Sequence, residues 1–176
     1  MTLEEIFYVS QSVASLAVVG SLIYLGLQVR YAERSQRGIM QQGRADRTSQ
    51  GSLMLADPAL ALVWKKGMAG DSDLTPLEFT QWMLICRSAF LSGEDSFMQH
   101  KAGLLAPSAY ESYVSGVRFY MATPGVRAAW KLSRGQFGDE FRAFGDAVVN
   151  EMEGAPPRAD AYTEWKRLVA KDAPVA

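Results

Sequence analysis

The chain has few of the residues from which catalytic and metal centres are usually built. A single histidine, His100, and a single cysteine, Cys86, occur among its 176 residues. One cysteine cannot form an internal disulfide, and these numbers are too small for a structural zinc site. Motifs for phosphate-binding loops, dinucleotide-binding turns, serine-hydrolase elbows and zinc-protease helices do not occur. We therefore expect no cofactor and no metal.

An excess of charge of one sign is also missing. Eighteen Lys and Arg residues oppose nineteen Asp and Glu residues, which leaves a net charge of -1. Without an overall basic field, nucleic acid is not an expected partner. No segment alternates apolar and polar residues as an exposed strand would, and no internal repeat occurs. The composition, 48% hydrophobic and 21% charged, fits a globular helical domain.

Charge is absent altogether from residues 6–29, IFYVSQSVASLAVVGSLIYLGLQV. At about 1.5 Å per residue this run makes a helix of roughly 36 Å, longer than a hydrocarbon core of about 30 Å. A signal peptide begins with positive charge, whereas Glu4 and Glu5 precede this run. We predict an uncleaved transmembrane helix over residues 6–29 after a short external N-terminus, residues 1–5. A signal peptide and a buried core helix are the alternatives.

Basic residues follow the run and predict its orientation. The positive-inside rule places the basic side in the cytoplasm, so the N-terminus lies outside a bacterial inner membrane that the chain crosses once. The same arginines are candidates for contact with anionic lipid headgroups, each worth about 1 kcal/mol near the surface. They are Arg30, Arg34, Arg37, Arg44 and Arg47.

One face of the predicted membrane helix is small or polar. In lipid, small residues let helix backbones approach, and polar side chains hydrogen-bond across the contact. This pattern predicts an interface with another membrane protein or with a second copy; an ordinary composition of membrane helices is the alternative. The run has no ligand for haem and no charge for a proton relay. The face comprises Ser10, Ala14, Ala17, Ser21, Tyr24 and Gln28, at steps of three and four residues.

The rest of the chain divides at its prolines and glycines. We expect a juxtamembrane helical extension and linker over residues 30–56, a helical bundle over 57–153 and a tail over 154–176. Thr75, Pro76 and Glu78 predict a capped helix that runs to about Lys101. The fold class is therefore all-α: a single N-terminal transmembrane helix extended into a small cytoplasmic bundle.

Periodic apolar positions identify the expected core of this bundle. Shorter helices are expected near residues 57–67, after Pro107, after Pro124 and over 137–152. Cys86 lies on an apolar stripe, which favours a buried thiol. The inward residues are expected to include Phe79, Met83, Cys86, Phe90, Gly93, Phe97, Val126, Trp130, Leu132, Phe137, Phe141, Phe144, Val148 and Met152.

The histidine lies in the one polar cluster with catalytic potential, Glu94, Asp95, Gln99 and His100. A carboxylate–histidine pair is a general base in many enzymes. No nucleophile or oxyanion motif accompanies the pair, and a histidine near a helix end is commonly a cap or a solvated side chain. We therefore expect a protein that is not an enzyme.

Four stretches in order carry a resemblance to a known family: AVVGSLIYLGLQVR, LTPLEFTQWMLICRSAF, HKAGLLAPSAYESY, and TPGVRAAW followed by FGDEFRAF. Together they cover most of residues 6–150. The chain resembles a widespread family of bacterial proteins with one N-terminal transmembrane helix and an all-helical domain. The resemblance implies that fold but no activity and no site residue. Family members usually carry more charge between Ser88 and Gln99 than this chain does.

Three functional hypotheses follow. The first is a non-catalytic accessory or scaffold subunit of a larger membrane complex, for which respiratory and photosynthetic assemblies are natural hosts. The second is a membrane-tethered cytosolic sensor or small-ligand-binding domain. The third is an enzyme that uses Glu94 and His100.

Overall fold

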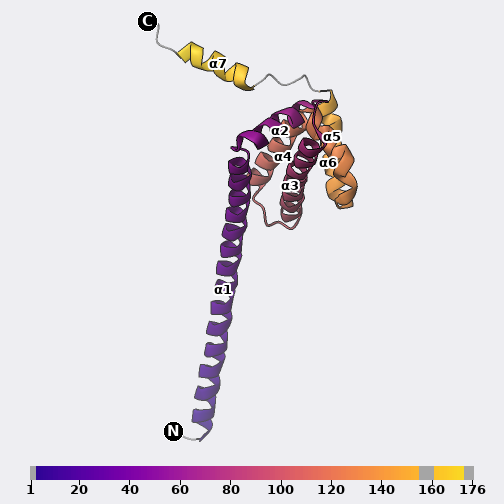
Figure 1. The fold of residues 1–176 in the computed structure, drawn as a ribbon. Coiled ribbons are helices and arrows are strands. Elements are labelled where there is room, and N and C mark those ends of the chain that lie inside the picture. The colour runs from indigo at the N-terminus through magenta and orange to yellow at the C-terminus, as the bar shows by residue number, and fades with distance from the viewer. Residues whose placement is uncertain (1–2, 155–160, 173–176) are drawn as a thin grey trace. The chain divides into compact units, whose positions relative to one another are not determined.

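The regular structure is helical throughout the described part of the chain. The computed structural model describes residues 3–154 and 161–172 (Figure 1). Within these ranges the all-α prediction is confirmed. The elements are α1 (Leu3–Met54), α2 (Pro58–Ala69), α3 (Pro76–Lys101), α4 (Pro107–Met121), α5 (Pro124–Ser133), a 3-10 turn (Arg134–Gln136), α6 (Asp139–Glu153) and α7 (Ala161–Asp172).

Prolines open the helices from α2 to α5. Each stands in the first turn, where a backbone N–H would have no partner inside the helix and the fixed φ of proline suits the helix. The predicted capping box of α3 is confirmed. The Thr75 hydroxyl accepts a hydrogen bond from the Glu78 N–H at 3.2 Å, and the Glu78 carboxylate accepts one from the Thr75 N–H at 2.8 Å. The predicted end at Lys101 is also correct.

The chain divides into two compact units, residues 1–49 and 50–176. The described part of the first unit is a stretch of α1. This helix is continuous from Leu3 to Met54, so it continues well beyond the apolar run. At 1.5 Å per residue its 52 residues span about 78 Å.

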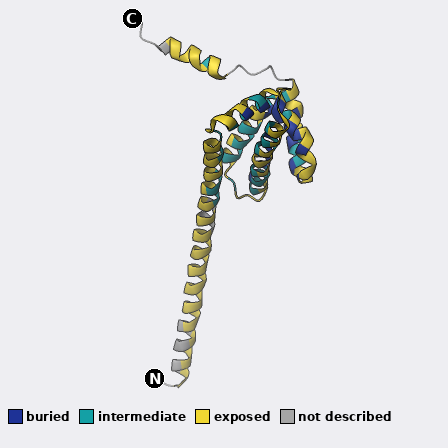
Figure 2. Cartoon of the chain, viewed as in Figure 1, coloured by how far each residue is buried: buried dark blue, intermediate teal, exposed yellow. Residues whose placement is uncertain are grey.

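The second unit contains a hydrophobic core shared by α2 to α6 (Figure 2). Trp130 lies at its centre and is 1% exposed. Its ring meets Phe90 edge-on at 5.2 Å and stacks against Phe137 at 5.5 Å. Its Nε1–H donates to Oδ1 of Asp146 at 3.0 Å, so its polar atom is also satisfied. The core of the bundle is therefore largely aromatic.

Two glycines allow the elements of this core to approach closely. A Cβ on Gly125 would lie 1.6 Å from the carbonyl oxygen of Gly67, so α2 and α5 meet with their backbones in contact. A Cβ on Gly145 would lie 2.2 Å from the Trp130 ring, which rests on the bare backbone of α6. Side chains at either position would force these helices apart.

Two residues predicted to face the core are exposed instead. Leu132 is 67% exposed and Phe79 is 44% exposed. Leu132 follows Trp130 by two residues, which places the two about 200° apart around α5, so burying Trp130 turns Leu132 outward. Phe79 lines an open depression together with Leu132. The other inward predictions are buried or half-buried.

Candidate functional site

The apolar window of α1 is the first candidate site. Residues Ala14–Ala32 form a helical segment of 19 residues, long and apolar enough to cross a membrane. At 1.5 Å per residue it spans about 28 Å, close to the thickness of a hydrocarbon core. None of the window is buried in the structure, unlike a helix at the centre of a soluble protein. A signal sequence near an N-terminus meets the same length and composition criteria.

The predicted small and polar face of this helix is exposed from Ala14 to Gln28. The side chain of Ser10 lies outside the described side chains. The Ser21 hydroxyl donates to the carbonyl oxygen of Ala17 at 2.8 Å, and Nε2 of Gln28 donates to the Tyr24 hydroxyl oxygen at 2.7 Å. Each polar group therefore has one partner within its own helix. The small residues of this face would let the backbone of another helix approach closely.

Arg30 lies in the last turn of this window, and the other predicted basic residues follow it along α1. Their spacing of four, three and seven residues places the first four on one side of the helix. Arg30 and Arg47 are exposed, and Arg44 is half-buried. The side chains of Arg34 and Arg37 lie outside the described side chains. A stripe of this kind can set the orientation of a membrane helix, and it can also bind anionic lipid headgroups.

The polar cluster near the histidine is divided among different neighbours. Oε1 of Glu94 accepts a hydrogen bond from the Gly138 N–H at 2.8 Å, just before α6 begins. Gln99 donates to Asp95 at 3.0 Å. The His100 ring stacks on Tyr110 of α4, with ring centres 3.6 Å apart and planes 4° apart. Six residues place Glu94 and His100 on different sides of α3, so the structure does not bring them together as a pair.

Cys86 is buried, as its place on the apolar stripe predicted. It is 3% exposed, and desolvation raises the pKa of its thiol to about 12. A thiol in this environment is protonated at neutral pH and is a poor nucleophile. Among the described residues, no group of three or more His, Cys, Asp or Glu side chains is placed to hold a metal ion.

A row of exposed apolar side chains on α3 was missed by the sequence reasoning. We call Leu77, Leu84, Leu91 and Met98 the leucine row. They are 70%, 61%, 49% and 52% exposed, respectively. Their spacing of seven residues keeps them on one side of the helix, with a drift of about 20° per step. This heptad spacing is visible in the sequence and is typical of helices that pack against another helix.

The C-terminal half of the leucine row borders an open groove of about 490 Å³. Leu91 and Met98 supply its apolar wall on α3, and Gly138 to Phe141 supply the wall at the start of α6. The carboxylates of Glu94, Asp95, Asp139 and Glu140 line it. Asp139 pairs with Arg142 and Glu140 with Lys101. The groove is therefore apolar along α3 with an acidic border.

A second open depression of about 490 Å³ lies where α5 meets the start of α3. Leu132, Pro76, Phe79 and Trp82 are among the residues that line it. Beside it, Nζ of Lys66 pairs with the Glu78 carboxylate at 2.8 Å. The hydrogen bonds from Lys66 and Thr75 lower the pKa of Glu78 to about 2.

Comparisons with protein families, with curated proteins and with solved structures found no match for this chain.

Proposed function

We propose that the protein is a non-catalytic accessory or scaffold subunit, anchored in a bacterial inner membrane and associated through α1 with a larger complex. The observation that carries the proposal is the apolar window Ala14–Ala32, which is long and apolar enough to cross a membrane and of which no part is buried. An uncovered apolar surface of this length is unfavourable in water and favourable in lipid.

The basic stripe that begins at Arg30 supports one orientation for this anchor. Arginines follow the uncharged run of residues 6–29 on one side of α1, and the residues before that run include Glu4 and Glu5. With the basic end in the cytoplasm, the N-terminus lies outside and the bundle lies inside the cell.

The small and polar face of α1 supports association with another membrane helix. Ala14, Ala17 and Ser21 let a neighbouring backbone approach closely, and the remaining hydrogen-bonding capacity of Gln28 favours a protein surface over lipid tails. A second copy and a different membrane protein both fit such a face. Energy-transducing assemblies, respiratory or photosynthetic, are the hosts that we consider first.

Purification from native membranes tests the proposal. The intact protein is extracted in mild detergent. Mass spectrometry then identifies the proteins that co-purify with it and measures the mass of the intact chain, which shows whether the N-terminal run has been removed. We expect co-purifying membrane proteins and a retained N-terminal run. Migration as a lone monomer would refute association, and a mass that lacks the first helix would show a cleaved signal.

A matched pair of variants tests the contact face itself. Ala17→Leu enlarges a residue on the small and polar face and is expected to weaken association while membrane insertion persists. Val19→Leu also enlarges a residue of the window but lies about 200° away around the helix, so it is expected to have little effect. Equal association of both variants with the partners would show that this face makes no contact.

A further inference from the structure

Two exposed apolar faces of the second unit have no cover in the described structure. One is the leucine row of α3. The other lies on α7, where Tyr162, Trp165, Leu168 and Val169 are between 48% and 62% exposed. Trp165 follows Tyr162 by three residues, and Leu168 and Val169 follow Trp165 by three and four, so these residues form one stripe along a helix of 12 residues. Isolated helices of this length are marginally stable in water, so α7 needs a surface against which to pack.

We propose that α7 docks on the leucine row of its own chain, running in the same direction as α3. In this arrangement Tyr162 lies toward Leu84, and Val169 lies toward Leu91 and Met98. The contact covers both apolar faces at once, and it is a helix-in-groove contact of a common kind. It is independent of the membrane anchor and goes beyond the scaffold role.

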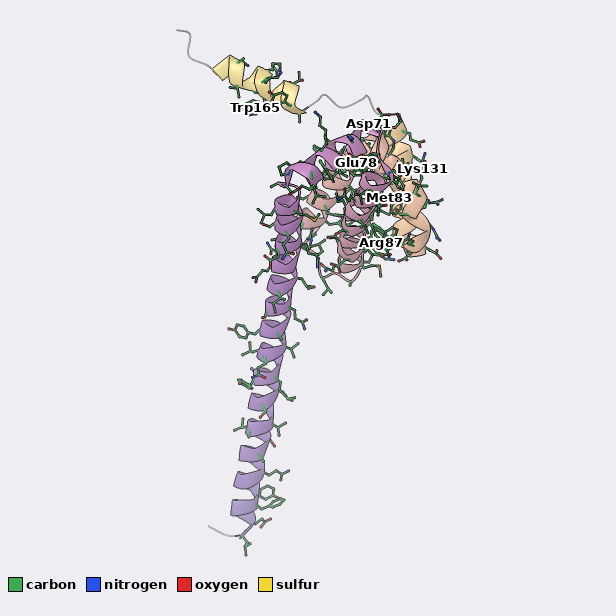
Figure 3. All side chains as sticks on the ribbon, in the orientation of Figure 1. Asp71, Glu78, Met83, Arg87, Lys131 and Trp165 are labelled. Atoms are coloured by element: carbon green, nitrogen blue, oxygen red, sulfur yellow. The ribbon has the colours of Figure 1, made fainter. Side chains whose placement is uncertain are left out.

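The order of charges along the two helices favours this direction. Arg87, labelled in Figure 3, lies between Leu84 and Leu91, whereas Glu94, Asp95, Asp139 and Glu140 border the groove farther along. On α7, Glu164 lies in the first turn and Lys171 lies in the last turn, just before Asp172, which ends the helix. Docking in the same direction brings Glu164 toward Arg87 and Lys171 toward the carboxylates. The opposite direction would bring Lys171 toward Arg87 and Glu164 toward the carboxylates, which pairs like charges.

The route of the chain also favours this direction. Glu153, the last residue of α6, pairs with Lys131 at 2.5 Å, and the adjacent Leu132 lines a depression together with Pro76 and Phe79. The chain therefore leaves α6 at the end of the bundle where α3 begins. Residues 154–160 then connect to α7. This is an ordinary length for a connection between helices, with a reach of up to about 25 Å.

Disulfide trapping in the intact protein tests the contact. The native Cys86 is buried and does not compete. We expect the pair Leu91→Cys and Val169→Cys to oxidise within one chain, seen as a faster band on a non-reducing gel. The matched control pairs Leu91→Cys with Arg167→Cys, which lies about 160° from Val169 around α7, and is expected to cross-link much less.

Each other result of this experiment overturns the proposal. Equal cross-linking of both pairs would mean that α7 has no fixed face toward α3. No cross-linking of either pair would mean that α7 lies elsewhere. A cross-linked dimer would mean that the row binds α7 of a second copy.

Fluorescence gives a measurement that needs no introduced cysteine. Trp82 and Trp130 are 3% and 1% exposed and Trp64 is half-buried, so Trp165, at 57%, is the tryptophan most accessible to a quencher in water. If docking protects Trp165, Leu91→Glu raises its exposure, because loss of one buried leucine lowers the equilibrium constant for docking by about tenfold or more. Iodide quenching then rises, and subtracting the spectrum of Trp165→Phe isolates this signal.

The matched control is Leu132→Glu, which changes an exposed leucine away from the row and is expected to leave iodide quenching unchanged. Strong quenching of Trp165 by iodide in the wild-type protein would refute docking. Quenching by brominated lipids in bilayer discs would place α7 on a membrane surface and would also refute it.

Discussion

The backbone contact between α2 and α5 makes Gly125→Ala a severe test of the fold. The added Cβ would lie 1.6 Å from the carbonyl oxygen of Gly67 and 3.1 Å from the amide nitrogen of Gly70. Both are backbone atoms, so no side-chain rotation relieves the clash, and the two helices must separate. Overpacking of this kind costs roughly 1–3 kcal/mol, and a backbone obstacle places the cost near the upper end.

The expected change is large enough to measure as a melting temperature. For a bundle of about 100 residues, each kcal/mol lowers Tm by about 4–8 °C, so Gly125→Ala is expected to lower it by roughly 10–20 °C. The near-ultraviolet circular dichroism bands of tryptophan report unfolding around the buried Trp82 and Trp130, and the α1 window contains no tryptophan. The measurement uses the intact chain in detergent.

Gly116→Ala provides the matched control for this prediction. A Cβ at Gly116, inside α4, meets nothing within 4 Å. Alanine is favoured over glycine in a helix by up to about 1 kcal/mol, so this variant is expected to keep or slightly raise Tm. If Gly125→Ala melts with the wild type or above it, α2 and α5 do not meet at these glycines and the packing described here is wrong.

Three further predictions concern the bundle. The pKa of Glu78 is lowered from 4.5 to about 2, so its pairing with Lys66 stabilises the fold above pH 4.5, and this stabilisation is lost as pH falls toward 2. Glu78→Gln should therefore have a lower free energy of unfolding than the wild type at pH 6. In denaturant titrations this difference should disappear near pH 2. Cys86, with a thiol pKa of about 12, should resist maleimide in the folded protein and react rapidly in denaturant; fast labelling without denaturant would show an open core. Trp130→Phe removes the hydrogen bond to Asp146 and leaves a cavity, so it should cost roughly 1–3 kcal/mol in denaturant unfolding, and a neutral result would contradict the packing around this ring.

Helix boundaries were the best-predicted part of the fold, because the signals that set them are local. A proline fixes its own φ, and Thr75 and Glu78 exchange hydrogen bonds across three residues, so both signals act without the rest of the chain. The side of a helix that faces the core was predicted less well. Trp130 and Leu132 are both large and apolar, and only the neighbours of α5 decide which one is buried.

Some features of the candidate sites could likewise be predicted from the sequence, and others depended on the packing. An uncharged run followed by arginines is a property of composition, so the apolar window of α1 was predictable from the sequence. The spacing of six residues already places Glu94 and His100 on different sides of α3, but their partners, the Gly138 N–H and the Tyr110 ring, depend on which segments lie beside α3, and the sequence does not show those neighbours. The leucine row had a sequence signal in its spacing of seven, but leucine is commonly buried, so only the packing of α3 shows that this row is exposed.

The sequence by itself determined the helical class, the ends of most helices and the apolar run from Ile6 to Val29, because each depends on residues within a few turns of one another. The tertiary structure decided what depends on segments far apart in the chain. Gly67 meets Gly125, Glu94 binds the backbone of Gly138, and the leucine row stays uncovered by α2 to α6 because these elements bury the other faces of α3. These contacts depend on shape and volume between helices, which no local pattern of residues specifies.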